Sequence, residues 1–278
     1  MVESAGESPR RHRSLSQLSK YASCSEDYRL SYVDKVPQDA PAAWLAQGTA
    51  FHVAVQGWEE SGRSPLFDIG QVYVVSYDQQ IEEFKAKQPD LNKWLRGPRT
   101  ATADDIRARR EKGITQLQNY VDYAENNNFV IAYVDDFNMA VEVDFEIEIG
   151  GVLVKGAIDQ ILEHPDGFEV RDLKTGNRAS GMLQVALYVL VVEKIFKWPV
   201  NKASYYYAKD NKLVTMSRKE LDRYDEAYLG ELFRTLERGI DNQVFIPNPG
   251  GHCMLCPVKK YCREMGETPR ALGEIPPF

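Results

Sequence analysis

Cysteine and long apolar runs are both scarce in this sequence. It contains four cysteines among 278 residues, and 43% of its residues are apolar. A chain of this length and apolar content can bury a core of its own without disulfides. The longest apolar stretch, Val185–Val192, is far shorter than the roughly 20 residues that span a membrane, so we expect no membrane association.

The first thirteen residues lack an apolar segment as well. They are polar and end in the run Arg10-Arg11-His12-Arg13, which is unlike the apolar part of a secretory signal. We therefore expect a disordered tail at residues 1–13 and a cytoplasmic protein. The remaining sequence shows no internal repeat and no low-complexity linker, which predicts a single domain over residues 14–278.

Hydrophobic periodicity and turn residues predict an α/β fold. Helices are expected at residues 15–22, 42–60, 78–87, 103–126, 182–196 and 218–239. Strands are expected at residues 140–148, 152–162, 168–173, 202–207 and 212–216. Gly150-Gly151 predicts a turn between the first two strands. Residues 61–135 are interpreted as a helical insertion that precedes the sheet.

Two carboxylates and a lysine lie on neighbouring predicted strands. In an alternating strand Val170, Asp172 and Lys174 point the same way, so charged groups continue an apolar row. A carboxylate there costs on the order of several kcal/mol unless it is paired or bound to a cation. With Asp159 near the end of the preceding strand, the two acids can hold a divalent cation, and Lys174 can act on a water. A buried Asp172–Lys174 ion pair is the alternative.

The order and spacing of these residues resemble those of a known family. Asp159, Asp172 and Lys174 form a D-x12-D-x-K pattern, and Gln184 and Tyr188 follow it as Q-x3-Y. This combination resembles the PD-(D/E)XK nuclease superfamily, in its RecB-like branch. The resemblance implies a restriction-endonuclease-like αβββαβ core, in which a mixed central sheet is flanked by helices.

A histidine motif extends the resemblance upstream. Gly48-Thr-Ala-Phe-His52 is similar to the G-x3-H motif of the RecB-like branch, and the similarity runs from about Ser14 to Cys262. On a predicted helix, a lone histidine is otherwise a satisfied or exposed side chain. The order of all the motifs together is what makes the resemblance specific.

The resemblance implies a role for each of these residues. His52, Asp159, Asp172 and the backbone carbonyl of Leu173 would bind the metal, Mg²⁺ or Mn²⁺. Lys174 would act on the attacking water.

Three further residues extend the resemblance, and two of them, Tyr188 and Glu142, also have a structural interpretation. Gln184 and Tyr188 lie four residues apart on one helical face, where the resemblance implies contact with the substrate phosphate or with the lysine. Tyr188 otherwise packs in the core. Glu142 fits an acidic position of the family, and is otherwise a solvated strand residue.

The four cysteines form the second pattern. Cys24 stands near the start, and Cys253, Cys256 and Cys262 form C-x2-C-x5-C near the end. Disulfides explain this poorly in a chain that shows no export signal, and four thiolates are typical of a metal centre. Tetrahedral zinc is an alternative, although zinc sites usually show two C-x2-C halves.

This divided cysteine pattern resembles the iron-sulfur nucleases of the RecB-like branch, including CRISPR-associated and AddB-type members. The resemblance implies a [4Fe-4S] cluster held by Cys24 and by the loop at residues 246–265, with Zn²⁺ as the alternative. The cluster would clasp the N- and C-terminal segments together, and its binding energy would be partly folding energy.

The formal net charge of -7 is unusual for a nucleic-acid-binding protein. A local basic cluster can still attract phosphates, because screening limits charge effects to about 8–10 Å at ordinary salt. Six basic residues crowd one segment, namely Arg96, Arg99, Arg107, Arg109, Arg110 and Lys112. They either guide a strand over the active site or form a solvated helical face. Trp58 and Trp94 similarly either stack on bases or anchor helices.

Together these features predict a metal-dependent DNA exonuclease that acts on single strands or ends, in recombination, repair or phage DNA processing. A helicase, a recombinase or an integrase would be its protein partner. One alternative is a nuclease with the same chemistry that trims DNA in CRISPR adaptation. The other is a DNA-binding scaffold without catalysis.

Overall fold

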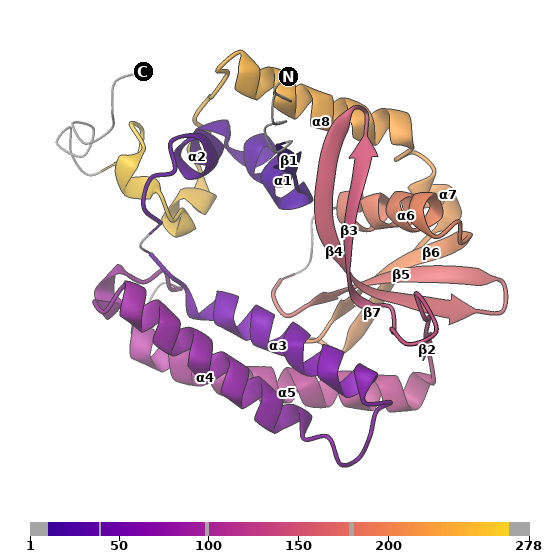
Figure 1. Cartoon of the computed structure of the whole chain (residues 1–278). Coiled ribbons are helices and arrows are strands. Elements are labelled where there is room, and N and C mark those ends of the chain that lie inside the picture. The colour runs from indigo at the N-terminus through magenta and orange to yellow at the C-terminus, as the bar shows by residue number, and fades with distance from the viewer. Residues whose placement is uncertain (1–10, 39, 98–99, 178–180, 267–278) are drawn as a thin grey trace, which may run out of the picture.

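The chain folds around one mixed β-sheet that carries helices on both sides (Figure 1). The computed structural model describes residues 11–38, 40–97, 100–177 and 181–266. The expected α/β class, with a mixed sheet flanked by helices, is confirmed.

The elements follow one another along the chain with the sheet mostly in the second half. The strands are β1 (His12–Arg13), β2 (Val130–Ile131), β3 (Val141–Ile149), β4 (Val152–His164), β5 (Gly167–Lys174), β6 (Val200–Tyr207) and β7 (Lys212–Ser217). The α-helices are α1 (Leu15–Ser23), α2 (Ser25–Tyr28), α3 (Ala43–Glu60), α4 (Ile69–Lys87), α5 (Thr102–Asn127), α6 (Leu183–Ile195), α7 (Arg218–Leu221) and α8 (Glu226–Asp241). Shorter helical turns are η1 (Arg29–Val33), η2 (Leu91–Lys93), η3 (Gly251–Leu255) and η4 (Lys259–Tyr261).

Strand β4 organises the sheet. It pairs in parallel with β1 and antiparallel with β2, β3 and β5, while β5 pairs in parallel with β6 and β6 antiparallel with β7. The β3–β4 hairpin turns at Gly150 and Gly151, whose φ angles of 60° and 83° cost glycine little. The β4–β5 register pairs Gln160 with Arg171. The adjoining Asp159 and Asp172 therefore share the opposite face of the sheet.

Helices α3, α4 and α5 pack together as a layer on one side of the sheet (Figure 1). Tyr73 and Tyr77 of α4 are fully buried, and their rings stack with centroids 5.7 Å apart. Their hydroxyls donate to the carbonyl oxygens of Arg109 at 3.0 Å and of Ile106 at 2.8 Å, both on α5. The two buried hydroxyls are thus satisfied, and they fix α4 against α5.

Two helices differ from the sequence expectation. Helix α4 begins at Ile69 rather than at residue 78, because the side chain of Asp68 caps it by accepting from the backbone N–H of Gln71 at 2.9 Å. The helix expected at 218–239 is two helices, α7 and α8. Asp225 starts the second one by accepting from the N–H of Tyr228 at 2.8 Å.

The predicted tail at residues 1–13 ends earlier than expected. Residues 1–10 lie outside the described residues. His12 and Arg13, however, form β1 and pair with β4, and the buried Arg13 forms an ion pair with Glu237 of α8. The expectation of a disordered tail is wrong for these two residues, because strand pairing and the ion pair hold them.

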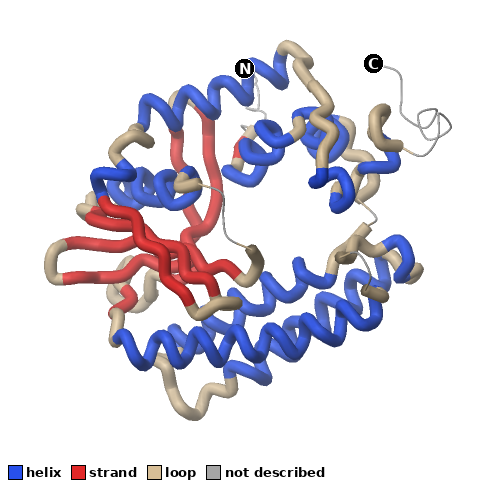
Figure 2. The backbone as a smooth tube through the Cα atoms, turned by 180° about the vertical axis from the view of Figure 1, so that it is seen from behind, coloured by secondary structure: helices blue, strands red, loops and turns tan. Residues whose placement is uncertain are grey.

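The segments that carry the cysteines lie side by side near the two ends of the chain (Figure 2). The hydroxyl of Ser25 donates to the carbonyl oxygen of Ile246 at 3.1 Å and accepts from its N–H at 2.6 Å. Asn248 donates to the carbonyl oxygen of Ser23 at 2.8 Å. Cys24, between these two serines, is therefore held next to the segment that leads to the other three cysteines.

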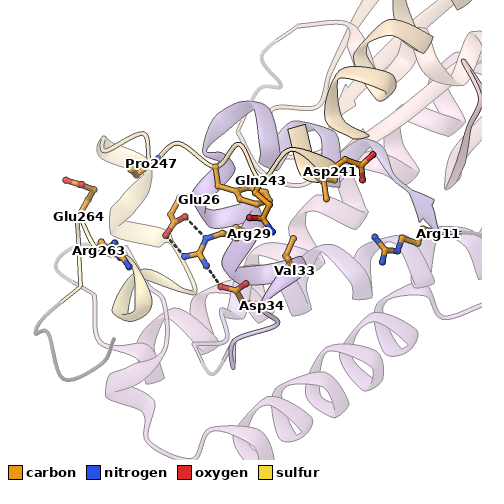
Figure 3. A pocket seen from close by; sticks show the side chains of 12 residues that line it. Arg11, Glu26, Arg29, Val33, Asp34, Asp241, Gln243, Pro247, Arg263 and Glu264 are labelled. Atoms are coloured by element: carbon orange, nitrogen blue, oxygen red, sulfur yellow. Dashed lines mark hydrogen bonds and ion pairs between the residues drawn. The ribbon is translucent and has the colours of Figure 1, made fainter. Parts of the chain in front are cut away.

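A cavity of about 580 Å³ lies along this junction (Figure 3). Its lining includes both signs of charge, and Arg29 forms ion pairs there with Glu26 and Asp34. Because these charges neutralise one another, we interpret the cavity as part of the structural junction.

No helix in the described part of the chain is both long enough and apolar enough to cross a membrane.

Replacing Gly113 with alanine tests the packing of α5 on α4. A Cβ at Gly113 would lie 1.9 Å from the hydroxyl oxygen of Tyr73. Overpacking of this kind should lower the free energy of unfolding by about 1 to 3 kcal/mol in urea titrations, although alanine favours a helix over glycine by about 1 kcal/mol. Gly70→Ala on α4 is the control, since its Cβ would meet its nearest neighbour at 3.5 Å. Equal or higher stability of Gly113→Ala would contradict the packing.

Candidate active site

A histidine and two carboxylates meet where α3 approaches the β3–β4 hairpin. His52 Nδ1 lies 2.7 Å from Glu142 Oε1 and 3.8 Å from Asp159 Oδ2. One ligand atom from each of the three residues lies within 4.8 Å of the other two. Nitrogen and carboxylate oxygen donors at this spacing can surround one metal ion.

The backbone of β3 is distorted at Glu142. This residue has φ of 49°, a left-handed conformation that is uncommon for side chains other than glycine. The β3–β4 register pairs Val141 with Gln160 and Val143 with Ile158, so Glu142 lies in the interruption between these pairs. A residue keeps such an unfavourable backbone conformation only where the surrounding structure imposes it, and these residues are frequent at functional sites.

Asp159 and Asp172 are the buried acids of the site. Asp159 Oδ2 accepts the backbone N–H of Leu173 at 2.6 Å, which ties the middle of β4 to the end of β5. Asp172 has no exposed surface, and its Oδ1 has no hydrogen-bond partner among the described residues. Its Oδ2 forms an ion pair with Lys174 Nζ at 2.7 Å. An unpartnered buried carboxylate oxygen is costly without a cation, so the donor set fits a divalent metal.

A chain of hydrogen bonds links Lys174 to two polar side chains of α6. Its Nζ donates to Gln184 Oε1 at 2.9 Å, and Gln184 Nε2 donates to the hydroxyl of Tyr188 at 2.9 Å. The ring of Tyr188 is 6% exposed and lies edge-on to Phe145, with centroids 6.3 Å apart. The ring of Tyr188 therefore lies in the core, and its hydroxyl accepts from Gln184 at the end of the polar chain. Contact of Tyr188 with the substrate phosphate stays a prediction.

The excess of carboxylates raises the proton affinity of the site. Burial by itself lowers the pKa of His52, but Asp159, Glu142 and Asp172 outweigh it and raise that pKa to about 9. Burial also raises the pKa of Asp159, and the charge of Asp172 adds to the effect. Burial raises the pKa of Asp172 as well, although Lys174 opposes this. Without a metal, the site holds protons that a cation would displace.

The turn after β5 is held by two buried glutamines that the sequence analysis did not select. Gln116 of α5 donates to the carbonyl oxygen of Thr175 at 2.7 Å and accepts from Gln47 of α3 at 2.6 Å. Arg109 donates to Gln47 at 3.0 Å. The sequence feature that could have identified them is a glutamine on the buried side of a predicted helix, because a buried amide needs hydrogen-bond partners.

The basic segment of α5 is mostly neutralised by neighbouring acids. Arg107 pairs with Asp104, Arg109 with Asp105 and Arg110 with Asp78. These arginines therefore fit a structural or solvated role better than strand guidance. Arg99 lies outside the described residues.

Both candidate tryptophans anchor helices. Trp58 is 5% exposed and Trp94 is 3% exposed. The indole N–H of Trp94 donates to the carbonyl oxygen of Gln88 at 2.9 Å. Neither ring is free to stack on a base.

The four cysteines form no disulfide and lie at the junction of the segments near the two chain ends. Cys253 is buried, and Cys24, Cys256 and Cys262 are partly buried. Burial raises the pKa of Cys256 to about 11, and the nearby Cys24 adds to this effect. Cys256 and Cys262 both pack against a small cluster that contains Val258.

Known proteins match this chain over most of its length. The sequence profile of the PD-(D/E)XK nuclease superfamily matches residues 12–263. The Gene 69 protein of Mycobacterium phage D29 is 32% identical over 259 residues, which cover 90% of this chain and 96% of the phage protein. The Gene 69 protein of Mycobacterium phage L5 is 28% identical over 278 residues, covering 90% of this chain and 95% of its own. Among solved structures, that of SSO0001 aligns with 66% of this chain and 80% of its own, at 18% identity and a TM-score of 0.36.

Metal binding should strengthen as the pH rises. The pKa of His52 is about 6.5 when unfolded and about 9 in the metal-free fold, so its proton stabilises that fold fully below 6.5 and ceases to do so as the pH passes 9. A metal must displace this proton. Between pH 6.5 and 8.5 the apparent Kd for Mn²⁺ should fall at least about tenfold, as measured by thermal shift titrations.

The matched variants are Asp159→Asn and Asp135→Asn. The first should abolish the Mn²⁺-induced shift, whereas the second changes an exposed loop carboxylate and should leave it intact. A shift that is independent of pH, or that survives in Asp159→Asn, would argue against this metal site.

Proposed function

Since this chain belongs to the PD-(D/E)XK nuclease superfamily, we propose that it is a metal-dependent DNA exonuclease that hydrolyses phosphodiester bonds in single-stranded or end-containing DNA. Membership of the superfamily supports nuclease activity, and the exonuclease mode is our proposal. The observation that supports nuclease chemistry is the convergence of five side chains where the middle of β4 meets the end of β5, namely Asp159, Asp172, Lys174, His52 and Glu142.

The residues that would hold Mg²⁺ or Mn²⁺ are His52, Glu142, Asp159, Asp172 and the carbonyl group of Leu173. Such a metal supplies Lewis-acid activation of water and of the phosphoryl oxygen. The unpartnered Oδ1 of Asp172 supports this assignment, because it leaves one buried acceptor for a cation.

Lys174 is the residue of the protein that would place a positive charge beside the substrate phosphate. Asp172 and Gln184 hold its Nζ from two sides. In this position the ammonium group would orient the attacking water and stabilise the negative charge that develops on the phosphate. Tyr188 in turn orients Gln184, and the two side chains would contact the substrate phosphate.

The biological setting we propose is phage DNA processing or recombination. The two phage proteins named above match this chain over nearly its whole length. A helicase or recombinase would supply DNA ends as its partner.

We also assign a [4Fe-4S] cluster to Cys24, Cys253, Cys256 and Cys262. The hydrogen bonds that hold Cys24 beside the segment leading to the other three cysteines support a shared metal centre, and tetrahedral zinc is the alternative occupant. The role of the cluster would be to reinforce the hydrogen-bonded junction of the chain ends.

Lys174→Ala should reduce exonuclease activity at least about 100-fold, because it removes the charge that acts on the water and phosphate. The assay follows end-labelled linear and circular single-stranded DNA with Mn²⁺. Lys194→Ala is the matched control, since this lysine pairs with Glu226 away from the site, and it should digest at the normal rate. Digestion of the circle at the rate of the linear strand would refute the exonuclease mode, and full activity of Lys174→Ala would refute the site.

Cys256→Ser should lose iron and sulfide and lower the midpoint of thermal unfolding by about 5 to 10 °C, since cluster binding contributes to folding. Anaerobically purified protein is analysed for metal content and by calorimetry. Met254→Ser, an exposed neighbour in the same loop, should keep both iron and stability. Stoichiometric zinc without iron in the unmodified protein would replace the cluster with a zinc site.

A further inference from the structure

Two adjoining cavities separate the cysteine-bearing loop from the helical layer. They measure about 480 and 330 Å³ and share Ala40, Leu95 and Pro257 in their linings. One wall comes from residues 254–260 and the other from η2 and the start of α3. We call this pair of cavities the basic groove.

The charged side chains among the described residues that line the basic groove are lysines. Lys93, Lys259 and Lys260 line the larger cavity and Lys87 the smaller one, and neither lining includes an Asp or a Glu among the described residues. Lys93 and Lys259 form no ion pair within the described part of the chain. Elsewhere in this protein of net charge -7, many cations are paired. The groove is therefore a local positive region on an acidic protein.

Apolar side chains are exposed beside these lysines. Leu45, Met254 and Leu255 are 54%, 67% and 46% exposed, and all three line the basic groove. The indole ring of Trp44 also lines it, with the guanidinium carbon of Arg109 at 5.4 Å from the ring centroid. Lysines next to an aromatic ring are typical of sites that bind single-stranded nucleic acid, where lysine meets phosphate and bases stack on the ring.

Helix α3 connects the groove with the metal site. Leu45, Thr49 and His52 follow one another on a single helical face, at spacings of four and three residues. His52 is seven positions after Leu45 on α3, which is about 10 Å along the helix axis. Gly48 lies on the same stripe and has no side chain to obstruct it. The stripe thus forms a short path from the basic groove to the predicted catalytic residues.

We propose that the basic groove binds a single strand of DNA whose neighbouring phosphodiester lies at the metal site. This inference rests on the proposed function and adds the path of the substrate. A duplex fits less well, because its bases are stacked on one another and cannot place their faces on Leu45, Leu255 or Trp44.

The test measures binding of fluorescein-labelled oligo(dT) by anisotropy at several salt concentrations, in the Lys174→Ala background so that the strand is not cut. Lys93→Glu with Lys259→Glu should weaken binding at least tenfold. Loss of two phosphate contacts should also reduce the slope of log K against log salt by about 1.4. Lys197→Glu with Lys219→Glu makes the same change of charge at exposed lysines on α7 and beyond α6 and should leave both quantities unchanged.

Lys93→Gln with Lys259→Gln removes charge without reversing it. It should give a smaller loss of affinity with the same reduction in slope, and it keeps the test valid if the reversed variant does not fold. Affinity and slope equal to those of the Lys197/Lys219 control would overturn the proposal. Blunt duplex DNA that binds as tightly, with the same dependence on Lys93 and Lys259, would overturn the assignment to a single strand.

Failure of this inference can be told apart from failure of the proposed function. If unmodified protein with Mn²⁺ digests no DNA, the nuclease proposal fails. If it digests DNA normally while the groove variants bind like the control, only the basic groove is wrongly assigned.

Discussion

The concentration of negative charge where the middle of β4 meets the end of β5 is the constraint on which the site depends. Glu142, Asp159 and Asp172 are drawn out of water toward one histidine and one lysine, and the pKa of both aspartates rises for that reason. Such a group is stable only with protons or with a cation. The excess of carboxylates destabilises the metal-free fold, and the same excess would provide the affinity for a divalent metal. A change that removes one of these carboxylates should therefore affect both stability and metal affinity.

The helical layer acts as the support of this charged site. Helix α3 contributes His52, while the hydrogen bonds from Gln47 through Gln116 to the carbonyl of Thr175 hold the turn that follows Lys174. On the other side of the sheet, α6 holds the lysine through Gln184. The lysine is thus fixed between a strand and a helix, which limits its rotamers in the way that a positioned catalytic group requires. The left-handed backbone at Glu142 stores strain of about 1 to 3 kcal/mol, which the β3–β4 pairing offsets.

Overall acidity and nucleic-acid binding are compatible here because charges act locally. The arginines of α5 face aspartates and contribute little net field, whereas Lys93 and Lys259 of the basic groove form no ion pair within the described part of the chain. At physiological salt the field of a charge decays within about 8 Å. A strand close to the groove would therefore sense its lysines rather than the net charge of the molecule.

Much of the site could be derived from the sequence because its rules are local. Strand alternation places Asp172 and Lys174 on one face, a tight hairpin brings Asp159 beside them, and spacing of four residues aligns Gln184 with Tyr188. The sequence could not show that Glu142 adopts a positive φ, nor that His52 meets its carboxylate across 90 residues. It also missed β1, the start of α4 and the approach of residue 93 to residue 259. These features depend on how separate segments pack against each other. Such contacts produce no hydrophobic periodicity within either segment, so the sequence pattern does not predict them.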